Sequence, residues 1–286
     1  MKKKTMRSLL CSLLAATTLA ACGGGSDDGV SSPRLYVLDC GNIEVRDWAV
    51  FQPGQPPGVV KNLAVSCYLV VHPSKGVLLY DTGLGDHYLG KGQVLIQGFA
   101  NFSIRQTLAS QLAEIGYPPE KITHLAISHL HLDHTGNARL FPNAMHLVQN
   151  EEFAAAFESD HPEDLVGEKE LVATLRNNPV TRLAGDHDVF GDGSAVIKRT
   201  AGHTPGHQSL AVKLQKSGTI VLSGDLAHST ENWVNKVVPG FNFDAAASMR
   251  SMLDIERYLL ANDAVLWVGH DLEQNARIRH APAFHE

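Results

Sequence analysis

The stretch Ser128–Gly136 (SHLHLDHTG) decides how the rest of this sequence is interpreted. It follows the apolar run Leu125–Ile127, which is typical of a buried strand. Within six residues it holds four side chains that can bind a metal ion: His129, His131, Asp133 and His134. Because alternate side chains at a strand end point the same way, the first two can converge on one ion. The last two lie within reach of a second ion, so the stretch predicts a metal site that activates water.

The alternative is that these four residues occur close together by chance and bind no metal. The chain has 15 histidines, so some pairs at short spacing arise by chance in ordinary surface or core positions. Four ionisable groups buried together are different, because their burial is costly unless a cation compensates them. The spacing therefore favours metal binding.

Three later segments add candidate ligands. The stretch Thr200–His207 (TAGHTPGH) places His203 in a Gly/Pro loop after a strand, where it is expected to be the third ligand of the first ion. His207 is expected to pack nearby or to form a hydrogen bond behind the ligands. Asp225 and His270 each end a predicted strand. Asp225 alone would be an ordinary turn carboxylate, but its place between two ligand histidines favours a carboxylate that bridges two cations.

The composition indicates one globular catalytic domain behind a leader. The chain has 286 residues, of which 44% are hydrophobic and 19% charged. Strands are predicted at Arg34–Val45, Ala64–Val71, Gly76–Asp81, Ala144–Val148, Ala195–Thr200, Gln208–Leu214, Thr219–Ser223 and Ala264–Val268. Helices are predicted at Ser103–Ile115, from Glu151 to Phe157 and from an Asp244 cap to Leu260, with irregular chain between Gly90 and Asn101.

The N-terminus has the pattern of an export signal. Basic residues precede the apolar run Leu9–Ala21, which ends in LAACG around Cys22. This ending resembles the lipobox of bacterial lipoproteins, which implies cleavage before Cys22, its lipidation, and anchoring in the cell envelope facing the periplasm. A plain secretory signal is the alternative. The domains predicted are residues 1–21 (signal), 22–33 (flexible tether) and 34–286 (metallo-hydrolase).

The charge of the chain bears on its substrate class, and its cysteines bear on whether it contains a disulfide. Without residues 1–21 the chain keeps 20 basic and 30 acidic residues, a formal charge of −10. Such a balance argues against nucleic acid as substrate, because phosphate binding needs a basic surface. Cys40 and Cys67 can form a disulfide in an oxidising compartment or remain as two buried thiols. Nothing in the sequence indicates an oligomeric state.

The motifs together resemble the metallo-β-lactamase superfamily and, within it, the quorum-quenching N-acyl homoserine lactone lactonases. The resemblance covers nearly all of Arg34–Glu286. Besides the metal motifs it rests on Leu35–Gly41 (LYVLDCG), Gly202–Leu210 (GHTPGHQSL), Lys216–Asp225, Glu231–Trp233 (ENW) and Gly269–Gln274 (GHDLEQ).

The resemblance implies an α+β fold, an αβ/βα sandwich of two mixed β-sheets flanked by helices. It assigns one metal to His129, His131, His203 and Asp225, and the other to Asp133, His134, Asp225 and His270. Zinc is the expected ion, although iron, cobalt or manganese suit such ligands. The implied reaction is the hydrolytic opening of a small-molecule lactone, with Asp133 managing the proton.

One position departs from the family pattern. The family often has a tyrosine three residues after the bridging aspartate, where this chain has His228. We expect His228 to contact substrate as a catalytic group, since histidine can also donate to a developing oxyanion. The alternative is a histidine that points to solvent. An apolar trench for an acyl chain is predicted from Trp48, Phe51, Ile96, Phe99 and Phe102, which could instead be core or membrane-facing residues.

Other functions use the same metal core. The enzymatic alternatives are an esterase, a thioesterase or a β-lactamase, of which the last usually lacks the bridging aspartate found here. A non-catalytic lipoprotein that binds metal or signal molecules is the alternative from another class. The complete ligand set argues against it.

Overall fold

The strands and helices of this chain were obtained from a computed structural model, which describes residues 32–96, 98, 100–159 and 175–286. The strands are β1 (Arg34–Val45), β2 (Lys61–His72), β3 (Gly76–Tyr80), β4 (Val94–Ile96), β5 (Ala100–Ser103), β6 (His124–Ala126), β7 (Met145–Gln149), β8 (Val180–Leu183), β9 (His187–Asp188), β10 (Ala195–Arg199), β11 (Gln208–Leu214), β12 (Gly218–Leu222) and β13 (Ala264–Trp267). The α-helices are α1 (Leu108–Glu114), α2 (Leu132–Thr135), α3 (Asn150–Phe157), α5 (Thr230–Asn235), α6 (Ala245–Asn262) and α7 (Leu272–Asn275).

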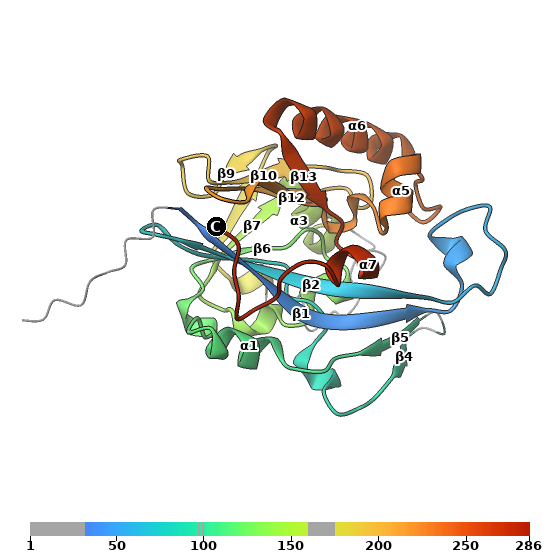
Figure 1. Cartoon of the computed structure of the whole chain (residues 1–286), viewed down its shortest axis with the longest axis horizontal. Coiled ribbons are helices and arrows are strands. Elements are labelled where there is room, and N and C mark those ends of the chain that lie inside the picture. The colour runs from blue at the N-terminus through green and yellow to red at the C-terminus, as the bar shows by residue number, and fades with distance from the viewer. Residues whose placement is uncertain (1–31, 97, 99, 160–174) are drawn as a thin grey trace, which may run out of the picture. The chain divides into compact units, whose positions relative to one another are not determined.

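The strands form two mixed sheets (Figure 1). The first has the order β4-β5-β1-β2-β3-β6-β7-β8, and the second β13-β12-β11-β10-β9. In the first sheet β3, β6, β7 and β8 are parallel neighbours, whereas β1 and β2 pair antiparallel. Among the described strands of the second sheet, β12 and β13 pair in parallel and the other neighbours pair antiparallel. The predicted α+β sandwich is confirmed.

Strand β1 shows why the sheets pack as layers. Leu35 and Val37 point into the core shared with the second sheet, while Tyr36 and Leu38 point into the core that contains α1. Successive side chains of a strand face opposite sides, so an almost continuous apolar run is buried on both faces. The first sheet is therefore an inner layer.

Helix α6 covers the outer face of the second sheet (Figure 1). Its Met252 and Ile255 pack against the β11 and β12 side chains Ala211 and Val221. The carboxylate of Asp244 accepts a hydrogen bond from the Ala247 N–H at 2.9 Å, which confirms the predicted N-cap.

Two local predictions were wrong. The helix expected from Ser103 begins at Leu108 with Thr107 as N-cap, because Ser103 instead pairs with Asn42 of β1. The chain expected to be irregular before Asn101 contains β4 and β5, which extend the sheet at its edge. Strand pairing between distant segments overrode the local helical pattern here.

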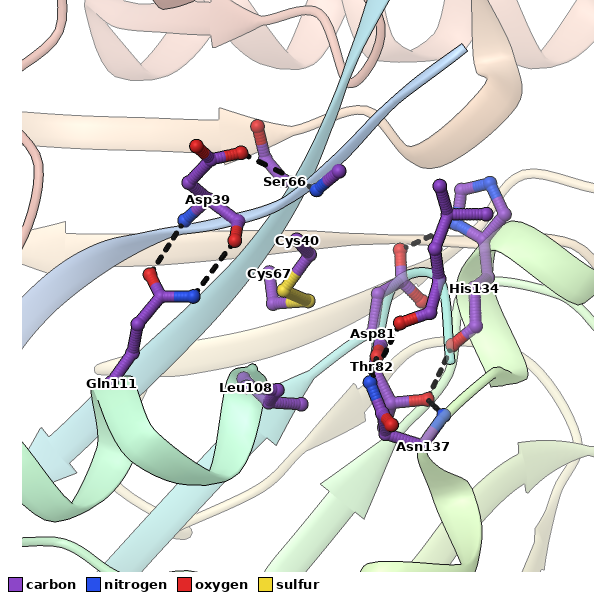
Figure 2. The surroundings of a disulfide bond; sticks show 12 residues. Asp39, Cys40, Ser66, Cys67, Asp81, Thr82, Leu108, Gln111, His134 and Asn137 are labelled. Atoms are coloured by element: carbon purple, nitrogen blue, oxygen red, sulfur yellow. Dashed lines mark hydrogen bonds and ion pairs between the residues drawn. A yellow bond between two sulfur atoms is a disulfide. The ribbon is translucent and has the colours of Figure 1, made fainter. Parts of the chain in front are cut away.

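Cys40 of β1 and Cys67 of β2 form a disulfide, which decides between the two alternatives left by the sequence (Figure 2). Gly83 passes so close to it that a Cβ there would lie 2.2 Å from the Cβ of Cys40, so only glycine fits. The loop from Asp81 to Gly83 thus rests directly on the crosslink.

The predicted signal (residues 1–21), Cys22 and residues up to 31 of the tether lie outside the described residues, as does Phe99. In the described part of the chain no helix is both long and apolar enough to cross a membrane.

Candidate metal centre

The loop after β6 carries the first candidate ligands. His129 and His131 follow the strand end, and the short helix α2 that begins next carries Asp133 and His134. Asp81, at the end of β3, accepts hydrogen bonds from the N–H and the hydroxyl of Ser128 at 2.6 and 3.0 Å. The parallel neighbours β3 and β6 thus end together, and this fixes where the histidine loop begins.

Three imidazoles meet in the first ligand group, which we define as His129, His131 and His203. Nε2 of His129 lies 2.8 Å from Nδ1 of His131, and Nε2 of His203 lies 3.1 Å from both. Burial is the main cause that lowers the pKa of His131 to about 3 and holds the pKa of His129 well below its usual value. Neutral imidazoles whose nitrogens converge are the donors that divalent metal ions bind.

The second ligand group comprises Asp133, His134 and His270. Oδ2 of Asp133 lies 3.5 Å from Nε2 of His134 and 3.4 Å from Nε2 of His270. Burial opposes the ionisation of Asp133, but His134 and His270 outweigh it and hold the pKa of this carboxyl below its usual value. The group therefore contains a carboxylate beside two imidazoles.

Asp225 lies between the two groups. Its Oδ2 is 3.2 Å from Nε2 of His203, whereas its Oδ1 is 3.0 Å from Nε2 of His270 and 3.3 Å from Nε2 of His134. Each carboxylate oxygen thus faces one group. This is the arrangement expected of a ligand that bridges two ions.

The donor atoms fit a pair of divalent cations. Within the described residues, Nε2 of His134 and Oδ1 of Asp225 are buried and form no hydrogen bond of suitable geometry, although imidazole nitrogens lie 3.0–3.3 Å from that oxygen. Buried polar atoms normally have a partner, and an ion between the groups would supply one. All seven ligands predicted from the sequence (His129, His131, Asp133, His134, His203, Asp225 and His270) are brought together here.

Hydrogen bonds behind the ligands orient the imidazoles. Nδ1 of His134 contacts Oδ2 of Asp81 at 2.9 Å, and Nδ1 of His270 donates to the Ala64 carbonyl at 2.7 Å. Nδ1 of His203 lies 3.1 Å from Oδ1 of Asn242. Such partners fix the ring orientation and the ligating nitrogen. Asp81 and Asn242 were not predicted from the sequence, because they lie far along the chain from the histidines that they contact.

His207 has the supporting position that the sequence predicted. Its Nε2 accepts a hydrogen bond from the backbone N–H of Asp225 at 2.8 Å, and its Nδ1 lies 2.9 Å from the Thr200 hydroxyl. It therefore holds Asp225 in place and points no nitrogen at either group.

His228 is buried at 1% exposure beside the metal centre, so the solvent-facing alternative is wrong. Its Nε2 lies 3.1 Å from Oδ2 of Asp225, and its ring stacks on His270 with centroids 5.7 Å apart. Its Nδ1 has no hydrogen-bond partner among the described residues. Burial is the main cause that lowers the pKa of His228, which favours the neutral ring.

An aromatic wall borders His228. The Phe51 ring meets it edge-on at 4.8 Å and meets Phe241 at 5.2 Å, and Trp48 stacks behind Phe51 at 5.1 Å. Phe241 was missed by the sequence analysis, although it is partly exposed and also approaches His203 at 5.8 Å. The predicted substrate residue Trp48 is thus near the centre but buried behind Phe51.

The other predicted trench residues have different positions. Phe102 is buried in the core and meets Tyr88 edge-on at 6.2 Å. Its role in substrate binding stays a prediction, as do the roles of Phe99 and of the Ile96 side chain, which are outside the described part of the structure.

Comparisons with known proteins agree with this geometry. The family model of the metallo-beta-lactamase superfamily matches residues 60–270. The chain is 30% identical to N-acyl homoserine lactonase AttM of Rhizobium radiobacter over 263 residues, covering 88% of this chain and 98% of the relative. It is likewise 30% identical over 261 residues to an N-acyl homoserine lactonase of Bacillus sp, with the same coverage.

A solved structure is similar over the same region. It is an N-acyl homoserine lactone hydrolase with the product N-hexanoyl-L-homoserine bound at its catalytic metal centre. The TM-score is 0.75 at 27% identity, and the match covers 88% of this chain and 98% of that one.

Proposed function

Because this chain belongs to the metallo-beta-lactamase superfamily and, within it, to the N-acyl homoserine lactonase family, we propose that it hydrolyses N-acyl homoserine lactones. The observation that carries the proposal is the position of Asp225, whose two oxygens each face one ligand group. The neighbour with bound N-hexanoyl-L-homoserine supports the substrate class.

The proposed ligands divide as the geometry does. His129, His131 and His203 would hold one divalent ion, and Asp133, His134 and His270 the other, with Asp225 shared. Zinc suits these imidazole and carboxylate donors. When bound, two such ions lower the pKa of water enough to make it a nucleophile at neutral pH, and they polarise the ester carbonyl.

Asp133 is the proposed proton carrier. In the hydrolysis, a bond forms from water oxygen to the lactone carbonyl carbon, the ring C–O bond breaks, and a proton reaches the departing alkoxide. The Asp133 side chain is 15% exposed, more than any other carboxylate of the centre, and His134 and His270 keep it ionised. It can therefore accept the proton from water and pass it to the leaving oxygen.

His228 is the proposed donor to the lactone carbonyl oxygen. Its ring lies between His203 and His270, with centroids 5.3 and 5.7 Å away, and its Nε2 faces the centre, 3.1 Å from Oδ2 of Asp225. A neutral imidazole protonated on Nε2 can donate this N–H to the oxygen as negative charge develops there. The exposed ring of Phe241, which packs on the buried ring of Phe51, provides an apolar surface for the acyl chain.

We also propose that the protein is a lipoprotein anchored through Cys22 and facing the periplasm. The lipobox-like LAACG around Cys22 supports the anchor. The Cys40–Cys67 disulfide supports an oxidising compartment, since disulfides persist outside the reducing cytosol. Palmitate labelling of the full chain in cells, with Cys22→Ser as the comparison, tests this: equal labelling of both proteins contradicts the anchor.

The test of the activity is ring opening of N-hexanoyl homoserine lactone by zinc-loaded protein, followed by acid release at constant pH and by product mass. We expect turnover that disappears after chelation and returns with zinc. A cephalosporin and a thioester are assayed in parallel. Hydrolysis of either one without lactone opening would contradict the proposal and favour that alternative activity.

A further inference from the structure

Glu152 is a buried carboxylate that the sequence analysis did not single out. It lies in the first turn of α3 and is 2% exposed. Burial raises the pKa of its carboxyl, whereas hydrogen bonds from its neighbours act in the opposite direction. A carboxylate in such a position is costly unless its oxygens are well satisfied.

Both oxygens of Glu152 accept hydrogen bonds, and the donors belong to two different ligand loops. Oε1 accepts from the backbone N–H of Leu130 at 3.0 Å, between the ligands His129 and His131. Oε2 accepts from the hydroxyl of Thr204 at 2.7 Å and from the backbone N–H of Gly206 at 2.9 Å, just after the ligand His203. One side chain therefore joins the loops that carry the first ligand group.

Close packing makes this link rigid. A Cβ on Gly206 would lie 2.4 Å from the backbone nitrogen of Glu152, so only glycine lets the His203 loop approach α3 this closely. Thr204 is fully buried as well. Among the described residues, Glu152 forms no hydrogen bond with the second ligand group. In that group, His134 contacts Asp81 instead.

We infer that Glu152 is a positioning residue, which sets the separation of the His129–His131 loop from the His203 loop and thereby the affinity of the first ligand group for its ion. The inference rests on the metal sites proposed above. It predicts an asymmetric effect: loss of the carboxylate weakens one ion and leaves the other in place.

The test is metal titration of Glu152→Gln in the full-length protein, with zinc affinities measured by competition with a chromophoric chelator. Glutamine keeps the size, but in either orientation its amide NH2 faces a backbone N–H donor, that of Leu130 or that of Gly206. We expect one zinc affinity to fall by about 10–100-fold, as for other lost partners behind metal ligands. The second affinity should match wild type, and the cobalt-substituted protein should show a changed absorption band for one ion.

Matched variants separate positioning from folding. Glu151→Gln changes the neighbouring carboxylate, whose partner Arg199 lies on the surface, and should bind both ions as wild type does. Thr204→Val removes a single donor and should weaken the same ion to a smaller extent, while Thr204→Ser should restore it. These milder variants carry the test should Glu152→Gln fail to fold.

The possible failures are distinguishable. Wild-type protein that binds fewer than two zinc ions contradicts the proposed metal centre itself. Two ions in wild type, with equal weakening of both or of neither in Glu152→Gln and Thr204→Val, overturn the inference. Lower unfolding stability with wild-type affinities and cobalt spectrum also overturns it, because the role is then only structural.

Discussion

The two ligand groups differ in how the protein holds them. The first consists of three imidazoles whose nitrogens lie 2.8–3.1 Å apart. The carboxylate behind it, Glu152, accepts hydrogen bonds from the backbone N–H groups of the two loops that carry these imidazoles. The second mixes a carboxylate with two imidazoles, and the carboxylate behind it, Asp81, contacts an imidazole directly. The two ligand groups thus depend on different supporting carboxylates. We therefore expect that a substitution can weaken metal binding by one group and leave the other unchanged.

The largest effect should come from the residue that the groups share. In Asp225→Asn, the amide nitrogen cannot ligate, so one of the two oxygen contacts is lost and the charge of the bridge with it. We expect kcat for lactone opening to fall on the order of 100-fold or more, since even partners behind the ligands are worth 10–100-fold. Turnover and bound zinc are measured on the same sample. Wild-type zinc content and kcat would show that Asp225 bridges nothing.

The disulfide should stabilise the fold and, locally, the second group. It closes a separation of 27 residues, and the backbone N–H of Leu84 donates to the Cys40 carbonyl at 3.1 Å. Thr82, two residues earlier, donates to the backbone carbonyl of His134 (Figure 2). For Cys40→Ala with Cys67→Ala, we expect the free energy of unfolding to drop by about 3–4 kcal/mol.

Urea denaturation of metal-free protein measures this loss, with the wild type in reductant as a second comparison. Zinc titration then reports on the groups. A weaker first-group ion beside an unchanged second-group ion would contradict the local role of the crosslink.

Asp81→Asn is the counterpart of the Glu152 substitution. It removes the charge behind His134, which orients that ring and makes its free nitrogen a stronger ligand. We expect the second-group affinity for zinc to fall by about 10–100-fold while the first-group affinity stays unchanged. Competition titration measures both, and Asp254→Asn, a surface carboxylate paired with Arg257, is the matched control. If Asp81→Asn and Glu152→Gln weaken the same ion, the two groups are not independently supported.

A buried histidine outside both groups provides the smallest effect. Burial lowers the pKa of His146 to about 4, and within the described residues neither ring nitrogen has a partner. The unfolded chain takes up a proton as the pH falls through 6.5 and the folded chain only near 4, so stability is lost across that window. Between pH 7.5 and 5.5, the free energy of unfolding of the metal-free protein should therefore fall by about 1 kcal/mol less in His146→Leu than in wild type.

Urea unfolding at the two pH values measures this difference. An identical pH dependence in wild type and His146→Leu would show that His146 is protonated, or solvated, in the folded state. The acid sensitivity of the protein would then arise from the ligand groups alone.

The convergence of the seven candidate ligands was predictable because each of them is encoded locally. His129 to His134 form one short block after a strand, and His203, Asp225 and His270 each follow a strand end. Strand ends of a sandwich converge at one edge, so the positions of these residues after strands predicted where the site lies as well as its metal-binding chemistry.

The supporting residues were not predictable, because folding brings them from separate segments. Glu152 lies in α3 and Asn242 in the loop before α6, and neither forms a sequence motif with the ligands that it supports. Asp81 follows an ordinary strand, and its contact with His134 spans 53 residues. The start of α1 was wrong for the same reason, since pairing of Ser103 with Asn42 is a contact between distant segments.

The number of zinc ions retained per chain, by elemental analysis after zinc loading and desalting, tests the paired centre most directly. We predict two ions in wild type and a single ion in both His203→Ala and His270→Ala, each of which removes one ligand from one group. Retention of one ion by the wild type, unchanged in either variant, would contradict a centre that binds two metals.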